Sequence, residues 1–257
     1  MYIDIIPNNT ADHTTMVFTK YCNWKRNNVY RYGTDKTVWG GGNDSFYDII
    51  NLYDYTIKPC VGCELCILKG TCSLQDDVPA LMNKFLEYDG IILSSPVYLR
   101  SVSGMLKTFV DRTCSWYHRP VLAGKPLLVV STTKGSGLGY TLEYLEDVGI
   151  QWGLMPTGRI GRSIRSIGNP VLKKECKPFI DTLKKGKRFH RPSLKCIMDF
   201  SVQKVLACKL GGLDAEYWEQ KGWNKSCYFY PCKINPVKKA LGNITFSFLN
   251  RVIKSLN

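Results

Sequence analysis

Short apolar runs and segments of helical periodicity alternate along the first 190 residues. The apolar runs predict five buried strands, at residues 2–7, 47–54, 90–96, 125–133 and, with a weaker pattern, 151–160. Apolar residues recurring at i, i+3 and i+4 predict helices between and after them, over residues 76–88, 103–117, 139–149 and 169–189. Strand–helix alternation with short connections is typical of an α/β fold with a doubly wound parallel sheet.

The pattern changes after residue 190, where no further strand is predicted. Helices are expected over residues 194–210, 214–223 and 235–256, the first of them stopped by the pair Gly211–Gly212. We therefore expect two parts: an α/β domain over residues 1–190 and a helical C-terminal extension over residues 191–257.

Charge divides the chain in nearly the same place. The net charge is +14, and residues 162–257 carry all of it, with 20 Lys and Arg against 6 Asp and Glu (20 − 6 = 14). A basic region of this kind favours acidic partners, among them anionic membranes, nucleic acid and acidic proteins, but it is equally typical of a solvated helical surface. No motif for reading bases is present, so we expect no nucleic-acid partner.

Nothing in the sequence predicts export or membrane insertion. The chain has no run of about 18 consecutive apolar residues, and its first residues lack the basic and apolar regions of a signal peptide. We expect a cytoplasmic protein without a membrane span. In that setting the eleven cysteines favour metal or redox chemistry over a disulfide framework.

Four of these cysteines form one compact motif with the spacing C-x2-C-x2-C-x5-C, at Cys60, Cys63, Cys66 and Cys72. Zinc sites usually combine two separated C-x2-C pairs, whereas three closely spaced thiolates can wrap a cubane cluster. Ser73 follows the fourth cysteine where a two-cluster ferredoxin has proline, so Cys72 is available as the local fourth ligand. The motif favours a 4Fe–4S cluster; a thiol–disulfide site and a zinc site remain as alternatives. The other seven cysteines are interpreted as small buried hydrophobic residues.

Two predicted strands end in loops of small and polar residues, at 94–104 and 131–139. Ligands of open parallel sheets bind at the carboxyl ends of the strands. The small residues would let backbone groups approach a flat ring with polar edges, such as a flavin. Each loop alone is equally compatible with an ordinary turn.

The cysteine motif followed by "YDGIILSSPVYLRSVSGMLKTFVDR" resembles the flavodoxin-like NADPH-dependent FMN reductase superfamily, and within it the iron–sulfur flavoprotein branch. The resemblance implies a five-stranded sheet of order 2-1-3-4-5, FMN at the strand ends and an adjacent 4Fe–4S cluster. It implies ring contacts from Ser95, Pro96, Val97, Tyr98 and Gly104, a second ring-side loop of Thr132, Thr133, Gly135 and Gly137, and cluster ligation by Cys60, Cys63, Cys66 and Cys72.

The first loop departs from this family, which usually carries a phosphate loop of the form GSPR-x-x-GNT. Here "IPNNTADHTT" has Asn9 in place of the arginine and Asp12 in place of the glycine, and it retains Thr14. Loss of the arginine removes a charge-assisted contact and predicts weaker FMN retention. The remaining candidate phosphate contacts are backbone N–H groups of a following helix and Asn8, Asn9, Thr10, His13, Thr14 and Thr15.

These features predict a redox flavoprotein that passes electrons between FMN, a 4Fe–4S cluster and a partner. The partner would be an acidic carrier, such as ferredoxin or flavodoxin, or a small acceptor; NAD(P)H is a further donor, and a homo-oligomer is expected. No side-chain acid or base is assigned as catalytic. Two alternatives remain: an NAD(P)H-dependent flavin or quinone reductase without a loaded cluster, and a non-catalytic electron-transfer or redox-sensing module.

Overall fold

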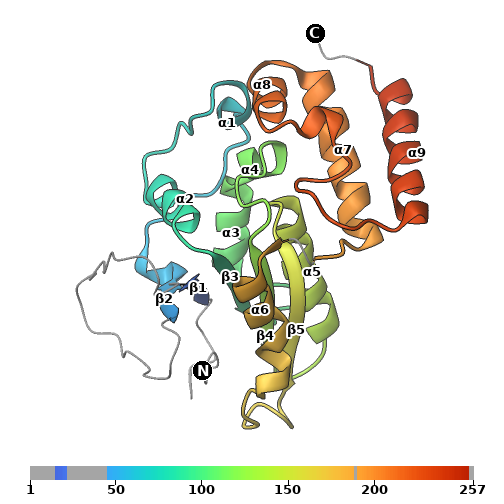
Figure 1. Ribbon diagram of the computed structural model, residues 1–257. Coiled ribbons are helices and arrows are strands. Elements are labelled where there is room, and N and C mark those ends of the chain that lie inside the picture. The colour runs from blue at the N-terminus through green and yellow to red at the C-terminus, as the bar shows by residue number, and fades with distance from the viewer. Residues whose placement is uncertain (1–14, 22–44, 188–189, 255–257) are drawn as a thin grey trace, which may run out of the picture.

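A five-stranded sheet forms the centre of the α/β part. The computed structural model describes residues 15–21, 45–187 and 190–254. The strands are β1 (Thr15–Tyr21), β2 (Ser45–Asn51), β3 (Gly90–Pro96), β4 (Pro126–Thr133) and β5 (Met155–Ser163), and they lie in the order β2-β1-β3-β4-β5. The three strands β3, β4 and β5 are parallel, while β1 is antiparallel to both of its neighbours (Figure 1).

The first strand of the sheet differs from the sequence prediction in position and direction. The expected first strand at residues 2–7 lies outside the described residues, and segment 15–21, expected to open a helix, is strand β1. Its sequence TMVFTKY is rich in β-branched and aromatic residues, which favour a strand over a helix. Because β1 is antiparallel, the expectation of a wholly parallel sheet is wrong in this structure, although β3, β4 and β5 follow it.

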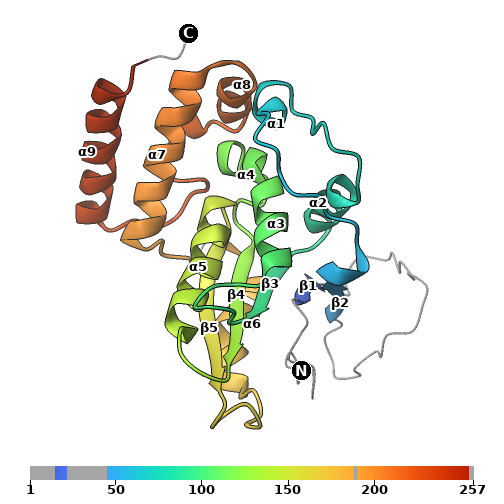
Figure 2. The same cartoon turned by 180° about the vertical axis from the view of Figure 1, so that it is seen from behind.

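Helices cover both faces of the sheet (Figure 2). One face packs against α2 (Val78–Leu86), α3 (Gly104–Arg112) and α5 (Leu138–Gln151), and the other packs against α6 (Lys173–Lys185). The alternation of side chains along the strands sets this division, because Leu127 and Val129 enter the first core and Leu128 and Val130 enter the second. The described residues before 190 also form the short elements η1 (Leu52–Asp54), α1 (Leu65–Leu68) and α4 (Cys114–His118).

The C-terminal extension is helical, with α7 (Leu194–Leu210), α8 (Gly212–Gln220), η3 (Trp223–Lys225) and α9 (Pro236–Val252). A third core joins it to the α/β part, since Ile150 and Met155 pack with Phe200, Trp218 and other residues of the extension. Polar contacts cross the same junction: the Gln203 amide donates to the backbone oxygens of Tyr117 (2.9 Å) and Gln151 (2.8 Å). The division at residue 190 stays a prediction.

Among the described residues, none of the helices combines the length and apolar character required to cross a membrane.

A group of aromatic rings fixes α2 and α3 against the start of α4. Phe85 is fully buried, stacks on Phe109 at 5.6 Å between centroids and meets the edges of Trp116 and Trp152 at 5.3 and 5.9 Å. The Trp152 indole N–H donates to the Thr113 hydroxyl at 3.0 Å, so the buried polar atom is satisfied. Phe85 lies at the centre of this packing.

We expect Phe85→Ala to lower the free energy of unfolding by about 3–5 kcal/mol, because it removes a fully buried ring and leaves a cavity. Urea denaturation followed by far-UV circular dichroism measures the change. Leu86→Ala is the matched control, since Leu86 is 46% exposed in the same helix and its loss should cost under about 1 kcal/mol. Equal losses for the two variants would contradict the assignment of Phe85 to the core.

Candidate functional site

The four motif cysteines lie on one loop between η1 and α2, which the structure closes at its base. The backbone N–H of Thr56 donates to the Asp77 carboxylate at 2.7 Å, and that of Lys58 donates to the Asp76 carboxylate at 2.9 Å. Cys60, Cys63 and Cys72 are exposed, and Cys66 is half-buried in the short helix α1. The loop is therefore anchored at its two ends and presents its thiols toward solvent.

A buried ion pair holds the second end of this loop. The Arg112 and Asp76 side chains are 1% and 0% exposed, and Arg112 donates two hydrogen bonds to the carboxylate. Arg112 also donates to the backbone oxygen of Lys58 at 2.7 Å and to the Cys72 sulfur at 3.3 Å. Burial raises the pKa of Asp76, but hydrogen bonds from Arg112 and from backbone N–H groups outweigh it, and the net pKa is lowered. Arg112 thus ties the last helical turn of α3 to the cysteine loop.

A second buried carboxylate, from the C-terminal extension, holds the middle of the loop. Asp214 in α8 is 2% exposed and pairs with Arg119 and with the His118 ring nitrogen, the latter at 2.9 Å. Arg119 in turn donates to the backbone oxygens of Cys66 and Ile67, the latter at 3.2 Å. The extension is therefore part of the framework that positions the cysteine loop.

A fifth cysteine meets the loop from α4. Cys114 is hydrogen-bonded to Cys66, and this bond is the main reason that the pKa of Cys66 falls to about 6, with nearby Arg119 and His118 adding to the effect against burial. The same bond and burial raise the pKa of Cys114. The interpretation of Cys114 as a buried hydrophobic residue is wrong, because Cys114 is half-buried and contacts the motif. Cys208, interpreted in the same way, is exposed.

The donor set suits a cluster in type and number, since four thiols lie on one loop of about a dozen residues. Their sulfur atoms have separate neighbours: Cys63 meets the Ser73 hydroxyl at 3.3 Å, Cys66 meets Cys114 and Cys72 meets Arg112. Within the part of the chain that the structure describes, no three Cys, His, Asp or Glu side chains are gathered to hold a metal ion. The chemistry of these ligands fits a cluster, and their assignment as ligands stays a prediction.

The two predicted flavin loops lie next to each other at the carboxyl ends of β3 and β4. The Val97 N–H donates to the Thr132 backbone oxygen at 2.9 Å. A side chain at Gly137 would come within 2.8 Å of the Arg100 Cα atom, so glycine permits the close approach of the second loop to the first. The structure therefore places the two loops side by side, and their contacts with a flavin ring stay a prediction.

Internal hydrogen bonds shape the first of these loops. The Ser95 hydroxyl, 1% exposed, accepts from the Ser103 N–H at 3.0 Å and donates to the Pro96 backbone oxygen at 2.9 Å. Its hydroxyl is thus already engaged, and any contact of Ser95 with a ring would come from its backbone. Ser103 caps α3, which begins at Gly104.

A tight turn projects the tip of this loop into solvent. Tyr98 and Ser101 exchange backbone hydrogen bonds at 2.8 and 2.9 Å across Leu99 and Arg100, which both have left-handed backbone angles (φ 47° and 67°). Two successive non-glycine residues in this region store strain of about 1–3 kcal/mol each. Tyr98 is 40% exposed, so part of its ring faces solvent at the place expected for a flavin.

In the second loop, the Thr133 hydroxyl accepts from the Gly135 N–H at 3.1 Å and donates to the Ser136 backbone oxygen. Thr132 and Thr133 end β4, and Gly137 directly precedes α5. This loop is therefore a compact turn held by its own threonine.

The flavin loops and the cysteine loop lie at opposite ends of α3. The β3–α3 loop leads into Gly104, whereas Arg112 at the other end of the helix contacts Cys72. Nine helical residues span about 13 Å, and Figure 2 shows α3 rising from the β3–α3 loop to α4, beside α1. The two loops are thus separated by the length of α3 within one chain, and the expectation that the cluster adjoins the flavin stays a prediction.

The predicted phosphate loop is the least described part of the site. Asn8, Asn9, Thr10, His13 and Thr14 lie outside the described residues, and Thr15 is the first residue of β1 rather than of a helix. No helix begins directly after Thr14 in this structure, and the phosphate contacts of this loop stay a prediction.

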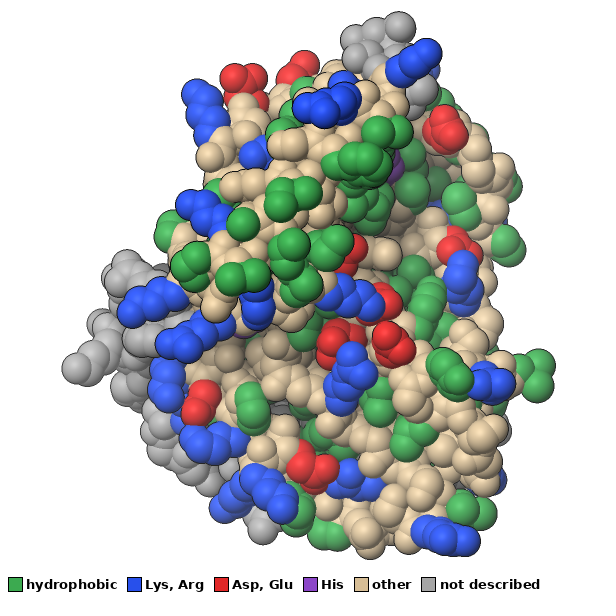
Figure 3. Space-filling model, turned by 90° about the vertical axis from the view of Figure 1, so that its right-hand side faces the viewer, with side chains coloured by type: hydrophobic (Ala, Val, Ile, Leu, Met, Phe, Trp, Pro, Cys, Tyr) green, Lys and Arg blue, Asp and Glu red, His purple; other side chains and the backbone are tan. Residues whose placement is uncertain are grey.

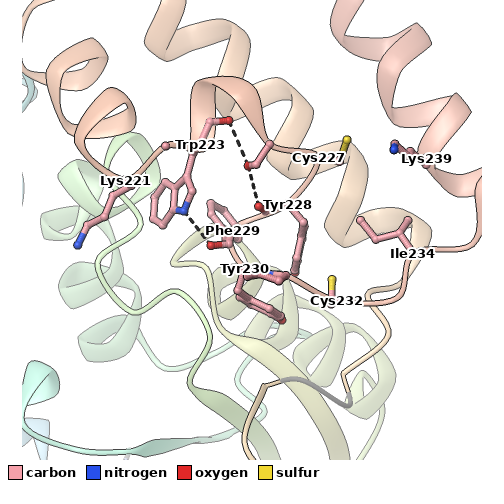
Figure 4. Close-up of a pocket in the computed structure, with 12 residues that line it drawn as sticks. Lys221, Trp223, Cys227, Tyr228, Phe229, Tyr230, Cys232, Ile234 and Lys239 are labelled. Carbon is pink, nitrogen blue, oxygen red and sulfur yellow. Dashed lines mark hydrogen bonds between the residues drawn. The ribbon is translucent and has the colours of Figure 1, made fainter.

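A cavity of about 460 Å³ lies in the C-terminal extension, lined by residues between Lys221 and Lys239 (Figure 4). Trp223, Tyr228 and Phe229 surround it, and the Trp223 indole N–H donates to the Phe229 backbone oxygen at 2.8 Å. None of the predicted site residues lines it, so this cavity is separate from both loops.

Sequence comparisons identify the family. Residues 44–164 match the family model for NADPH-dependent FMN reductase. An iron–sulfur flavoprotein of Archaeoglobus fulgidus is 32% identical over 188 residues, covering 68% of this chain and 83% of the relative. This chain belongs to the iron–sulfur flavoprotein branch of the NADPH-dependent FMN reductase superfamily. It is an oxidoreductase of a flavin-dependent family.

A second curated relative has the same description. An iron–sulfur flavoprotein of Clostridioides difficile is 26% identical over 191 residues, covering 67% of this chain and 84% of the relative. Among solved structures, the apo form of an NADH:FMN oxidoreductase has 21% identity and covers 47% of this chain and 63% of its own, but its TM-score of 0.34 is too low to establish a common fold.

The residues that position the cysteine loop were missed at the level of sequence. Arg112 and Asp76 are 36 positions apart, and Arg119 and Asp214 are 95 apart, so no local spacing marks either pair. The sequence signals for the first pair were the acidic residues in "QDD", shortly after the motif, and the arginine in "VDR" at residues 110–112.

We expect Asp76→Asn to lower the free energy of unfolding by about 3 kcal/mol at pH 7, because it leaves the Arg112 charge buried without its carboxylate. The pKa of Asp76 is lowered by folding, so its contribution is present above about pH 4 and is lost as the pH falls further. Urea denaturation between pH 3 and 7 measures both effects.

The control is Asp111→Asn, which removes an exposed ion pair with Lys107 on the same helix. Its effect should stay under about 1 kcal/mol. A loss for Asp76→Asn that does not shrink toward pH 3 would show that the carboxylate charge is not what stabilises the loop.

Proposed function

We propose that this oxidoreductase binds FMN at the loops after β3 and β4 and a 4Fe–4S cluster at Cys60, Cys63, Cys66 and Cys72, and passes electrons between them and an external partner. The observation that carries the proposal is the cysteine loop itself, fixed by two buried ion pairs that leave three thiols exposed. Buried charges are costly, and their placement under an exposed cysteine loop supports a role in holding that loop for a ligand.

The chemistry that each group would supply is distinct. FMN supports both one- and two-electron steps, and thiolate-bound iron supports one-electron steps. From the chain itself, Arg112 would donate to the Cys72 sulfur and Arg119 would hold the backbone at Cys66. Hydrogen bonds and positive charge beside the sulfurs would favour the more reduced, more negative state of the cluster.

The arrangement along α3 supports an assembly of more than one chain. Because one chain places the two loops at opposite ends of α3, a cysteine loop could approach a flavin more closely in a neighbouring copy than in its own. We therefore retain the homo-oligomer expected from the sequence as part of the proposal.

NAD(P)H or an acidic carrier is the proposed donor, and a small molecule or a carrier is the proposed acceptor. Relatives include an NADPH:quinone oxidoreductase of Arabidopsis thaliana, 40% identical over 75 residues that cover 28% of this chain and 36% of the relative. The ten described cysteines are all free thiols, which supports the cytoplasm as the proposed location.

A thiol–disulfide site is the second candidate, and the contact between Cys66 and Cys114 supports it. A cluster site holds iron and a thiol–disulfide site does not, so the iron content of one preparation distinguishes the two candidates.

We expect protein reconstituted anaerobically with iron and sulfide to hold about four iron atoms per chain, as a cubane cluster requires. Cys63→Ser/Cys66→Ser should lose most of this iron, as measured by iron and sulfide analysis and by the visible absorption of the reconstituted protein. Cys208→Ser, which replaces an exposed cysteine in α7, is the control and should keep it. If the wild-type protein held no iron and peptide maps showed a Cys66–Cys114 disulfide, the cluster would be ruled out and the thiol–disulfide site would be supported instead.

We expect Tyr98→Ala to weaken FMN binding by about tenfold, the loss of roughly 1.4 kcal/mol of ring packing. Quenching of FMN fluorescence on titration with apoprotein gives the dissociation constant. Tyr53→Ala is the control, because Tyr53 is 50% exposed on η1 and belongs to neither loop. If both variants bind FMN as the wild type does, the loop after β3 is not the ring site.

A further inference from the structure

The last helix, α9, presents a continuous apolar stripe to solvent. The stripe consists of Val237, Leu241, Ile244, Phe248 and Val252, whose side chains are 40–67% exposed. Their spacing of 4, 3, 4 and 4 residues keeps all five within an arc of about 80° around the helix. Isolated exposed apolar residues are common on proteins, but an ordered stripe along a whole helix marks an interaction surface.

The packing of α9 leaves this stripe free of the core. Gly242, the one fully buried residue described in the helix, faces α7, where an added Cβ atom would lie 2.6 Å from the Ile197 side chain. Gly242 is about 120° around the helix from the centre of the stripe. In Figures 1 and 2, α9 lies at the outer edge of the molecule with α7 between it and the α/β part. The stripe therefore faces outward from a helix whose other side is already packed.

The segment of the chain that carries the stripe has charges of a single sign. From residue 220 to residue 257 the sequence has no Asp or Glu and seven basic residues: Lys221, Lys225, Lys233, Lys238, Lys239, Arg251 and Lys254. Helical spacing places Lys238 and Arg251 along the two borders of the stripe. Figure 3 shows hydrophobic side chains grouped on the face where α9 lies, with Lys and Arg side chains around them and Asp and Glu side chains along part of the border.

We propose that α9 binds the surface of an anionic lipid bilayer, with the stripe in the interface and the basic residues on lipid headgroups. Helices that lie in a membrane interface combine an apolar face with flanking Lys and Arg, and their affinity comes from apolar burial together with attraction to anionic lipids. Seventeen residues span about 25 Å, and the helix lies on the surface without crossing it.

Charge complementarity selects this occupant. A second copy of the chain packed stripe to stripe would bring the basic residues along the borders of both stripes together, and like charges facing each other oppose such a contact. The anionic headgroups of a bilayer would attract the basic side chains, and its acyl chains would bury the apolar side chains along the full length of the helix. The proposal concerns a surface apart from both redox loops and does not depend on the proposed function.

Vesicle flotation of the full chain tests the proposal. We expect binding to vesicles of phosphatidylglycerol and phosphatidylcholine at roughly 3:7, and at least tenfold weaker binding to phosphatidylcholine alone. Binding should weaken as salt rises, because the flanking charges are screened within about 8 Å at physiological ionic strength. Ile244→Ser/Phe248→Ser should reduce binding to the anionic vesicles at least tenfold, and Arg251→Glu/Lys254→Glu should remove the preference for anionic lipid.

Leu86→Ser/Leu172→Ser is the matched control, since both residues are 46% exposed outside α9, and it should bind vesicles as the wild type does. Circular dichroism of all variants checks that the exposed substitutions leave the fold intact. Equal binding of wild type and Ile244→Ser/Phe248→Ser, or equal binding to neutral and anionic vesicles, would overturn the proposal. It would also fail if that variant only converted an oligomer to a monomer in light scattering, because the stripe would then be a subunit interface.

Discussion

The buried ion pair between Arg112 and Asp76 is the contact on which the arrangement of the cysteine loop depends. It joins the end of α3 to the end of that loop, and both side chains are almost fully shielded from water. A pair of this kind is a poor source of stability compared with apolar packing, because desolvation offsets most of the Coulomb attraction. Its role here is to hold the loop in position. Arg112 also donates to the Lys58 backbone oxygen and to the Cys72 sulfur, so one guanidinium connects α3 with both ends of the cysteine loop.

The second pair, Arg119 with Asp214, extends the same principle to the C-terminal extension. Asp214 lies in α8, yet the groups that Arg119 holds are the backbone oxygens of the cysteine loop. The indole N–H of Trp218 donates to the His118 backbone oxygen at 2.8 Å and fixes α8 against α4. The extension thus helps to position the cysteine loop, while its last helix faces outward with an apolar stripe and basic residues.

α3 separates two regions with different chemistry. At its start, small residues and a strained turn lie beside the second strand-end loop. At its end, cationic side chains meet thiols. The length of this one short helix therefore sets the spacing between the proposed flavin and cluster regions within one chain.

Much of the architecture was predictable because its signals are local. The short apolar runs at residues 90–96 and 125–133 predicted parallel strands β3 and β4, and the i, i+3 and i+4 pattern predicted α2, α3 and α5. The change after residue 190 predicted the helices α7, α8 and α9. The motif spacing marked the cysteine loop, and small residues after two strands marked the adjacent loops at their ends.

Tertiary structure decided what depends on residues far apart in the chain. The direction of β1 is set by which neighbours it pairs with, and residues 15–21 carry no signal for that choice. The pairing of Arg112 with Asp76 and of Arg119 with Asp214, and the contact of Cys114 with Cys66, arise only when α3, α4 and α8 pack around the loop. The sequence by itself determined which groups could do redox chemistry and that the basic charge lies in the last third of the chain. The tertiary structure decided how far apart the cysteine loop and the strand-end loops lie, because α3 packs between them and separates them by its length.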